Sequence, residues 1–214
     1  MKVKLENINI SYGDKEIYKD FSLEITSNKI TGILGRSGCG KTTLLNYIIS
    51  KIMNFEDISY VFQNDILIEW MSVYDNIDLV LKSKIKSKIE RNKIIETVLD
   101  LVNLREYKDY YPNKLSGGMR QRVNIARAVS YPSKYLFMDE PFKSLDIVNK
   151  FEIIKRLKKE ISKQDKTVII VTHDLDEIIE FSDEIVCLSG TPIKEINYFT
   201  VNKCISKNEL IKYI

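Results

Sequence analysis

The chain has little cysteine, glycine and proline: 3 Cys, 8 Gly and 4 Pro among 214 residues. The cysteines stand far apart, at Cys39, Cys187 and Cys204, with no CxxC pair and no cysteine–histidine cluster. This pattern argues against a disulfide framework and a zinc site, and it is typical of the reducing cytosol. So few glycines and prolines also exclude a collagen-like or low-complexity chain.

Long apolar runs and an excess of charge of one sign are missing too. No stretch approaches the roughly 18 apolar residues that a membrane-spanning helix needs, and the opening residues MKVKLE lack the apolar core of a signal peptide. Lys and Arg number 33 against 30 Asp and Glu, a net charge of +3, which is too small to indicate nucleic acid as the default partner. We expect a cytosolic protein that reaches a membrane only through a partner.

The composition that remains, 44% hydrophobic and 29% charged, is that of an ordinary globular protein. At about 150 residues per domain, the length predicts a single domain over 1–214. Short apolar or alternating runs predict strands at 3–10, 17–25, 30–34, 58–62, 135–138, 167–172 and 184–188. Apolar residues three and four apart predict helices at 42–52, 117–128 and 144–164, and a helical stretch from 73 to about 110. Alternation of strands and helices predicts an α/β fold with a mainly parallel core sheet and a helical insertion.

Residues 35–42 read GRSGCGKT, the pattern G-x-x-x-x-G-K-[ST], between a predicted strand and a predicted helix. The glycines let the backbone wrap around a phosphate with its N–H groups inward, and the helix offers its positive end to the same anion. Lys41 adds a charge for the β- and γ-phosphates, and the Thr42 hydroxyl is a Mg²⁺ ligand. The residues expected to bind ATP here are Gly35, Ser37, Gly38, Cys39, Gly40, Lys41, Thr42 and Thr43.

Residues 135–141 read YLFMDEP, an apolar strand that ends in two carboxylates. Asp139 at the strand end is suited to hold Mg²⁺ through water. Glu140 is suited to orient and deprotonate an attacking water. The alternative for Glu140 is a surface residue that only caps the strand.

Residues 115–122 read LSGGMRQR. Ser116 can cap a helix that begins around Gly117, and the two glycines let a phosphate of another chain approach its N-terminus. The alternative is a capped helix with basic side chains in solvent. With the preceding motifs, LSGG followed by QR resembles the signature of the ATP-binding cassette (ABC) superfamily, and the resemblance covers nearly the whole chain.

The resemblance implies a P-loop NTPase fold of the ABC type. In that fold a helical signature subdomain, here about 64–130, is inserted into a RecA-like core that carries an antiparallel β arm. The stretch from Lys41 to Gln63 is shorter than usual in the family, which implies a shortened arm. The sequence ends soon after the last predicted strand, so we expect no C-terminal regulatory domain.

The resemblance also implies individual roles. Tyr12 matches the aromatic residue that stacks on adenine, with a buried strand-end tyrosine as the alternative. Gln63 resembles the Q-loop glutamine, so that the Mg²⁺ ligands would be Thr42, Gln63 and Asp139. His173, the only histidine, resembles the switch histidine that contacts the γ-phosphate, with a structural histidine as the alternative.

Catalysis would therefore depend on Glu140, His173, Gln63 and Asp139. A second copy would complete each site in trans with Ser116, Gly117, Gly118 and Asp146, the last from residues 144–146, which resemble the D-loop. Such a twofold dimer has two equivalent ATP sites. ATP binds the closed dimer better and shifts the equilibrium toward closure.

Finer features resemble the nitrate/sulfonate/taurine importer branch: LIEWMSV at 67–73, MDEPFKSLD at 138–146 and LSGTP at 188–192, with Glu69 where that branch usually has proline. This resemblance implies a homodimer or a pair of close paralogues, an integral-membrane permease and an extracytoplasmic substrate-binding protein. The complex would import a small anion or organic solute, with this chain on the cytoplasmic face of the cell membrane. Trp70 is predicted to face the permease or pack on the Q-loop; the alternative is a core aromatic.

Three alternatives stay open. The first is the ATPase of an ABC exporter or cell-division complex, because transport direction is not written in a chain of this kind. The second is a soluble ABC ATPase of DNA repair or translation, although the sequence shows neither the long coiled coil nor the second cassette of those proteins. The third is a small-molecule kinase that shares only the phosphate loop, which the signature disfavours.

Overall fold

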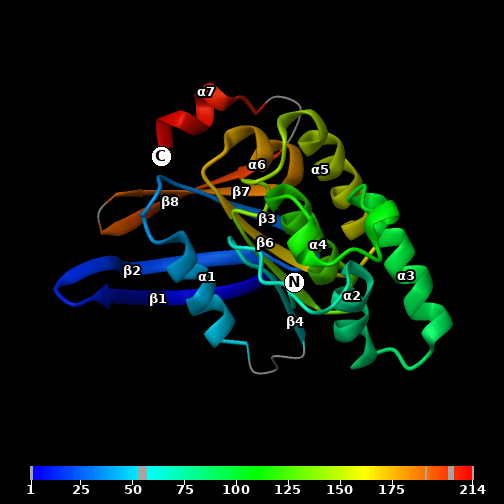
Figure 1. Cartoon of the computed structure of the whole chain (residues 1–214). Coiled ribbons are helices and arrows are strands. Elements are labelled where there is room, and N and C mark those ends of the chain that lie inside the picture. Colours follow the sequence, from blue (N-terminus) through cyan, green and yellow to red (C-terminus); the bar gives the residue numbers. More distant parts are fainter. Residues whose placement is uncertain (1, 53–56, 191, 202–204, 214) are drawn as a thin grey trace.

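The computed structural model describes residues 2–52, 57–190, 192–201 and 205–213, so Cys204 lies outside the described residues. Its strands form one eight-stranded sheet in the order β1-β2-β8-β7-β3-β6-β5-β4 (Figure 1). The strands are β1 (Lys2–Tyr12), β2 (Lys15–Thr26), β3 (Ile30–Leu34), β4 (Ile58–Val61), β5 (Tyr135–Asp139), β6 (Thr167–Thr172), β7 (Glu184–Gly190) and β8 (Ile193–Thr200).

The helices are α1 (Lys41–Ser50), α2 (Val73–Lys82), α3 (Lys88–Leu101), α4 (Gly117–Ser130), α5 (Ile147–Ile161), α6 (Leu175–Phe181) and α7 (Lys207–Leu210). The predicted stretch 73–110 therefore contains two α-helices, since α3 starts anew at a Ser87 cap, and a short 3-10 helix at Arg105–Tyr107. The predicted helix at 144–164 begins only at Ile147, because the Asp146 side chain caps it. In the described parts of the chain, no helix has both the length and the apolar character that a membrane crossing demands.

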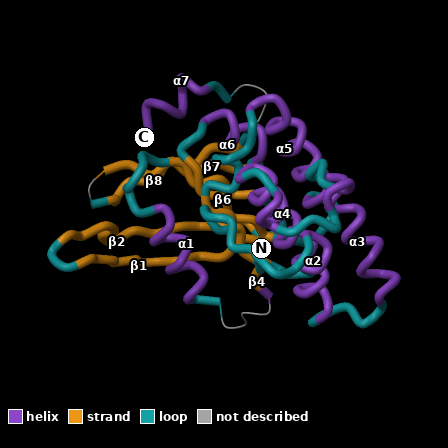
Figure 2. Tube along the Cα trace, in the orientation of Figure 1, coloured by secondary structure: helices purple, strands orange, loops and turns teal. Residues whose placement is uncertain are grey.

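The sheet has a parallel part and an antiparallel part. Strands β7, β3, β6, β5 and β4 are parallel to one another, which confirms the predicted parallel core. β1 and β2 form a long antiparallel hairpin that extends away from α2–α5 (Figure 2), and β8 runs antiparallel to β7. β2 joins β8 at a single parallel pair, Tyr18 with Ile193. These three strands are the antiparallel arm.

Side chains alternate along each strand, so the parallel strands supply two cores on opposite faces of the sheet. Val168 and Ile170 of β6 pack toward the helices α2–α5. Ile169 and Val171 pack toward α1 and the β1–β2 hairpin. All residues of β3 and β6 are buried, which explains why these two strands read as continuous apolar runs and keep the bounds predicted for them.

Strand β8 and helix α6 were not predicted. β8 mixes buried and exposed positions, with Ile193 buried and Tyr198 49% exposed, so it has no apolar run to identify it. It is a strand because it pairs with β7 along its length. α6 is short and is fixed at its start by the Asp174 side chain, which accepts two backbone N–H groups.

Candidate active site

The phosphate loop connects β3 to α1 and is closed by its own lysine. The Lys41 Nζ donates to the carbonyl oxygens of Gly35 at 2.8 Å and Arg36 at 2.9 Å, and the residue is only 7% exposed. Gly38 and Gly40 have φ of +75° and +103°, and a Cβ on Gly40 would lie 2.5 Å from the Ile17 side chain. Glycine is therefore required at position 40 both by backbone conformation and by space.

Helix α1 differs from the other described α-helices in how it begins. Those helices start at serine or aspartate side chains that accept a backbone N–H: Ser72, Ser87, Ser116, Asp146, Asp174 and Ser206. α1 starts at Gly40, which has no side chain to do so. Its first N–H groups are thus available to an anion, and the helix dipole favours one there.

A cavity of about 470 Å³ lies beside the loop, lined by Arg36, Ser37, Gly38, Cys39 and residues 188–190 of β7. Burial raises the pKa of the Cys39 thiol, so the thiol is neutral near pH 7 and does not repel a phosphate. A larger cavity of about 520 Å³, lined by residues of α3 and α5 among others, contains no phosphate-loop residue. The chemistry of the lining, rather than the volume, selects the smaller cavity.

A hydroxyl and a carboxylate meet at the end of β5. The Thr42 hydroxyl donates to Asp139 Oδ2 at 2.7 Å, and Asp139 is 5% exposed. Burial raises the pKa of Asp139, while the Thr42 hydrogen bond acts against that rise. Oxygen donors of this kind fit Mg²⁺, so the donor set agrees with the predicted metal site.

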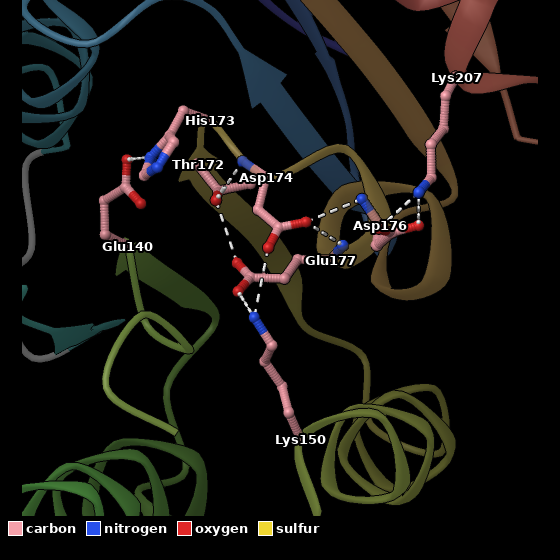
Figure 3. A network of polar contacts seen from close by, with 8 residues as sticks. All are labelled: Glu140, Lys150, Thr172, His173, Asp174, Asp176, Glu177 and Lys207. Carbon is pink, nitrogen blue, oxygen red and sulfur yellow. Dashed lines mark hydrogen bonds and ion pairs between the residues drawn. The ribbon is translucent and has the colours of Figure 1, made fainter. Parts of the chain in front are cut away.

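Glu140 and His173 come together at the ends of β5 and β6 (Figure 3). Glu140 Oε1 lies 2.8 Å from His173 Nδ1. Glu140 has φ of +47°, rare for a residue with a side chain, and its N–H donates to Val171 O at 2.9 Å. Such backbone strain is typical of functional positions. The side chain of Glu140 is 11% exposed and that of His173 is 50% exposed.

Gln63 and Glu140 lie just beyond the ends of neighbouring strands, at the same edge of the sheet. Val61 of β4 pairs with Met138 of β5, so Gln63 and Glu140 each stand two positions beyond a paired residue. Gln63 itself is exposed. The Tyr12 side chain lies outside the described residues, and only its backbone in β1 is placed.

Helix α4 holds the segment that follows β4 in place. The contacts between the two were not predicted from the sequence. Arg120 pairs with Asp65 and Glu69. Gln121 and Asn124 donate to the Phe62 carbonyl oxygen at 3.3 and 3.2 Å, and Gln121 also donates to the Pro141 carbonyl oxygen at 3.0 Å. These contacts have one signal in the sequence: polar residues of α4 that stand three and four positions apart, directly after LSGG.

The signature residues lie at the start of α4. Ser116 Oγ accepts the Met119 N–H at 3.2 Å, which confirms the predicted cap. A Cβ on Gly117 would meet nothing within 4 Å, whereas one on Gly118 would lie 2.8 Å from the Ser144 carbonyl oxygen. Asp146 Oδ1 accepts the Asn149 N–H at 3.1 Å. Ser116, Gly117 and Asp146 are exposed, so one chain brings together Lys41, Thr42, Asp139, Glu140 and His173 but leaves these three open to solvent.

A family model described as "ABC transporter" matches residues 18–143. The chain is 37% identical over 195 residues to the nitrate import ATP-binding protein NrtC of Synechococcus elongatus, covering 83% of the chain and 30% of that protein. It is 35% identical over 221 residues to the sulfate/thiosulfate import ATP-binding protein CysA of Mannheimia succiniciproducens, covering 92% of the chain and 61% of that protein. The chain thus spans less than two thirds of these relatives.

Solved structures of ABC cassettes have the same fold as this chain. The fold superimposes on "Dimeric Structure of MJ0796, a Bacterial ABC Transporter Cassette" with a TM-score of 0.80 and 28% identity, over 94% of this chain and 99% of that one. A post-hydrolysis dimer of MJ0796 bound to ADP and Pi gives a TM-score of 0.79 and 29% identity, over 94% and 99% of the two chains. The chain belongs to the ABC transporter family and has the fold of its ATP-hydrolysing cassette.

Proposed function

We propose that this chain is the ATP-hydrolysing subunit of an ABC transporter, and that two copies, or one copy and a close paralogue, close around two ATP molecules. The observation that supports this most strongly is the convergence of Thr42, Asp139, Glu140 and His173 beside the phosphate loop. In the same proposal, residues 1–214 form one ABC domain with a helical subdomain at about 64–130.

Each converging group has a role that follows from its chemistry. Lys41 and the backbone of the phosphate loop hold the β- and γ-phosphates, together with Ser37, Cys39 and Thr43. Thr42, Gln63 and Asp139 would hold Mg²⁺, which would neutralise phosphate charge there. Tyr12 stacks on adenine.

Glu140 is the general base. Its carboxylate accepts the proton of the attacking water. The imidazole nitrogen of His173, 2.8 Å from Glu140 Oε1, holds that carboxylate in one orientation. His173 keeps Glu140 in place and reaches the γ-phosphate. The second copy contributes Ser116, Gly117, Gly118 and Asp146, which lie at the starts of α4 and α5.

The transport reaction is proposed from the relatives. The two curated relatives are named import ATP-binding proteins for nitrate and for sulfate or thiosulfate. We infer import of a small anion or organic solute, with an integral-membrane permease and an extracytoplasmic substrate-binding protein as partners. The chain would then work on the cytoplasmic face of the membrane, and without nucleic acid.

The permease is proposed to dock near the segment after β4. Trp70 is 79% exposed, which excludes the core alternative, and Phe62, Ile66 and Leu79 are 43%, 54% and 41% exposed. A groove of about 370 Å³ is lined in part by Phe62 and Leu79. Exposed aromatic side chains are favoured interface anchors.

Trp70→Ala tests this docking surface. We expect less permease to copurify, while the free energy of unfolding of the isolated subunit changes by no more than about 0.5 kcal/mol, as for other exposed positions. Ile89, 72% exposed on α3, offers a matched control in Ile89→Ala. Equal copurification of the Trp70→Ala and wild-type chains would contradict the docking role.

Glu140→Gln tests the proposed hydrolysis. The amide keeps the shape of the side chain but takes no proton, so we expect ATP binding to persist and turnover to fall by roughly 10²–10⁴-fold. Steady-state ATPase of the permease complex, and retention of ATP on a trapped dimer, are the measurements. Normal turnover by this variant would refute Glu140 as the base.

A further inference from the structure

A buried ionic cluster links α5 to the segment that carries His173 (Figure 3). The Lys150 Nζ on α5 donates to Glu177 Oε1 at 2.6 Å and to Asp174 Oδ2 at 3.2 Å. The Lys150 side chain is 12% exposed and the Glu177 side chain is 2% exposed. The Lys207–Asp176 pair at the edge of the cluster is about half exposed by comparison, and exposed pairs of that kind contribute little.

The cluster fixes both neighbours of His173. The Thr172 hydroxyl donates to Glu177 Oε2 at 3.1 Å and accepts the Asp174 N–H at 3.1 Å. Asp174 Oδ1 accepts the N–H groups of Asp176 and Glu177, which starts α6. The backbone on each side of the histidine is therefore held by carboxylates that share one cation.

That cation is needed because the Glu177 carboxylate, 2% exposed, is out of water. A buried carboxylate is costly unless it is paired and hydrogen-bonded. Burial raises the pKa of Glu177, and Lys150 acts against that rise. Burial also tends to lower the pKa of Lys150, but Glu177 and Asp174 outweigh it and raise that pKa. Lys150 thus stays charged near pH 7 and supplies the positive charge of the cluster.

We propose that Lys150 is a positioning residue for ATP hydrolysis. By pairing with Glu177 and Asp174 it holds the backbone around His173 so that the imidazole stays within hydrogen-bond distance of Glu140. The proposal depends on the proposed function of Glu140 and His173. It also connects that pair to the start of α5, because the Lys150 N–H donates to the Asp146 carbonyl oxygen at 3.1 Å.

His173 is the only histidine, so one imidazole NMR signal of the full chain, carrying no histidine tag, reports its environment. We expect Lys150→Met to move this signal in the direction in which Glu140→Ala moves it, and Lys150→Arg to leave it near the wild-type position. In the permease complex, Lys150→Met should lower kcat on the order of tenfold with KM within about twofold, as for a misplaced catalytic group.

Lys158 provides the matched control. It lies on the same helix and donates to the carbonyl oxygens of Glu180 and Ser182 at 3.3 and 2.7 Å, at the end of α6 remote from His173. Lys158→Met should leave the imidazole signal and kcat unchanged. A signal that moves as far in Lys158→Met as in Lys150→Met would overturn the proposal in favour of general packing between α5 and α6.

Lys150→Met leaves Glu177 without its cation and could fail to fold. The double variant Lys150→Met/Glu177→Gln removes both charges and keeps the test decisive. If the double variant folds with a wild-type imidazole signal and kcat, Lys150 has no positioning role. Absence of ATPase in the wild-type permease complex would instead overturn the proposed function, whereas an unmoved signal in an active background overturns only the role of Lys150.

Discussion

The two halves of the proposed ATP site differ in how far a single chain completes them. Around the phosphate loop, Lys41 and Asp139 are 7% and 5% exposed and are hydrogen-bonded within the chain. At the starts of α4 and α5, Ser116 and Asp146 are exposed and cap the helices that follow them. One half is organised by contacts within the chain and the other is exposed, as expected of a site that a second copy completes.

The largest effect is expected from separating the two halves genetically. Lys41→Ala removes phosphate binding, and Ser116→Arg blocks the phosphate site of a second copy, so each variant alone should form no ATP-dependent dimer. In a mixed dimer, one site carries both changes and the other carries neither. Mixing should therefore restore one ATP site and part of the dimer. Size-exclusion chromatography with ATP, on a Glu140→Gln background, measures this.

A site built within one chain gives the opposite result, because every chain then carries one lesion. Failure to recover any dimer from two folded variants would contradict the contribution of Ser116 to the ATP site of a second copy. The unmixed variants serve as controls for folding by circular dichroism.

Gly117 and Gly118, at the exposed half of the site, differ in the space around them. Gly118→Ala places a Cβ 2.8 Å from the Ser144 carbonyl oxygen. Such an overlap should lower the free energy of unfolding by about 1–3 kcal/mol. Gly117→Ala meets open space and should leave the isolated chain as stable as wild type while weakening the ATP-dependent dimer. Urea denaturation and size-exclusion chromatography separate the two effects. Equal loss of stability in both would show that Gly117 is structural as well.

Tyr12→Ala probes the adenine side of the organised half and has the smallest expected effect. Loss of base stacking should weaken ATP binding by about 1–2 kcal/mol. Calorimetric titration with ATP on the Glu140→Gln background measures it, with Tyr213→Ala, a 36% exposed tyrosine near the C-terminus, as the control. An unchanged affinity would make Tyr12 a structural residue.

Much of the organised half could be predicted because it is local or follows from strand order. The phosphate loop lies within eight residues, and its lysine bonds to Gly35 and Arg36 nearby. Asp139 ends an apolar strand and His173 follows one, and the carboxyl ends of parallel strands meet at one edge of the sheet. The Thr42–Asp139 contact, across 97 positions, follows from those two facts.

The partners of the polar side chains on α4 could not be predicted from the sequence. Arg120, Gln121 and Asn124 of α4 bind the segment after β4 across more than 50 positions, and nothing in that segment names its partner. Lys150 was one lysine among many on a predicted helix, and only packing of α5 on α6 shows that it neutralises Glu177.

The sequence by itself determined the fold class, the phosphate loop and the order of the motifs, because apolar periodicity and glycine placement act over a few residues. Only the tertiary structure decided the place of β8, the left-handed backbone of Glu140 and the pairing of Glu140 with His173. The same is true of the exposure of Trp70. These features depend on which elements pack against each other, and charge pairing and burial between distant segments exist only after the chain has folded.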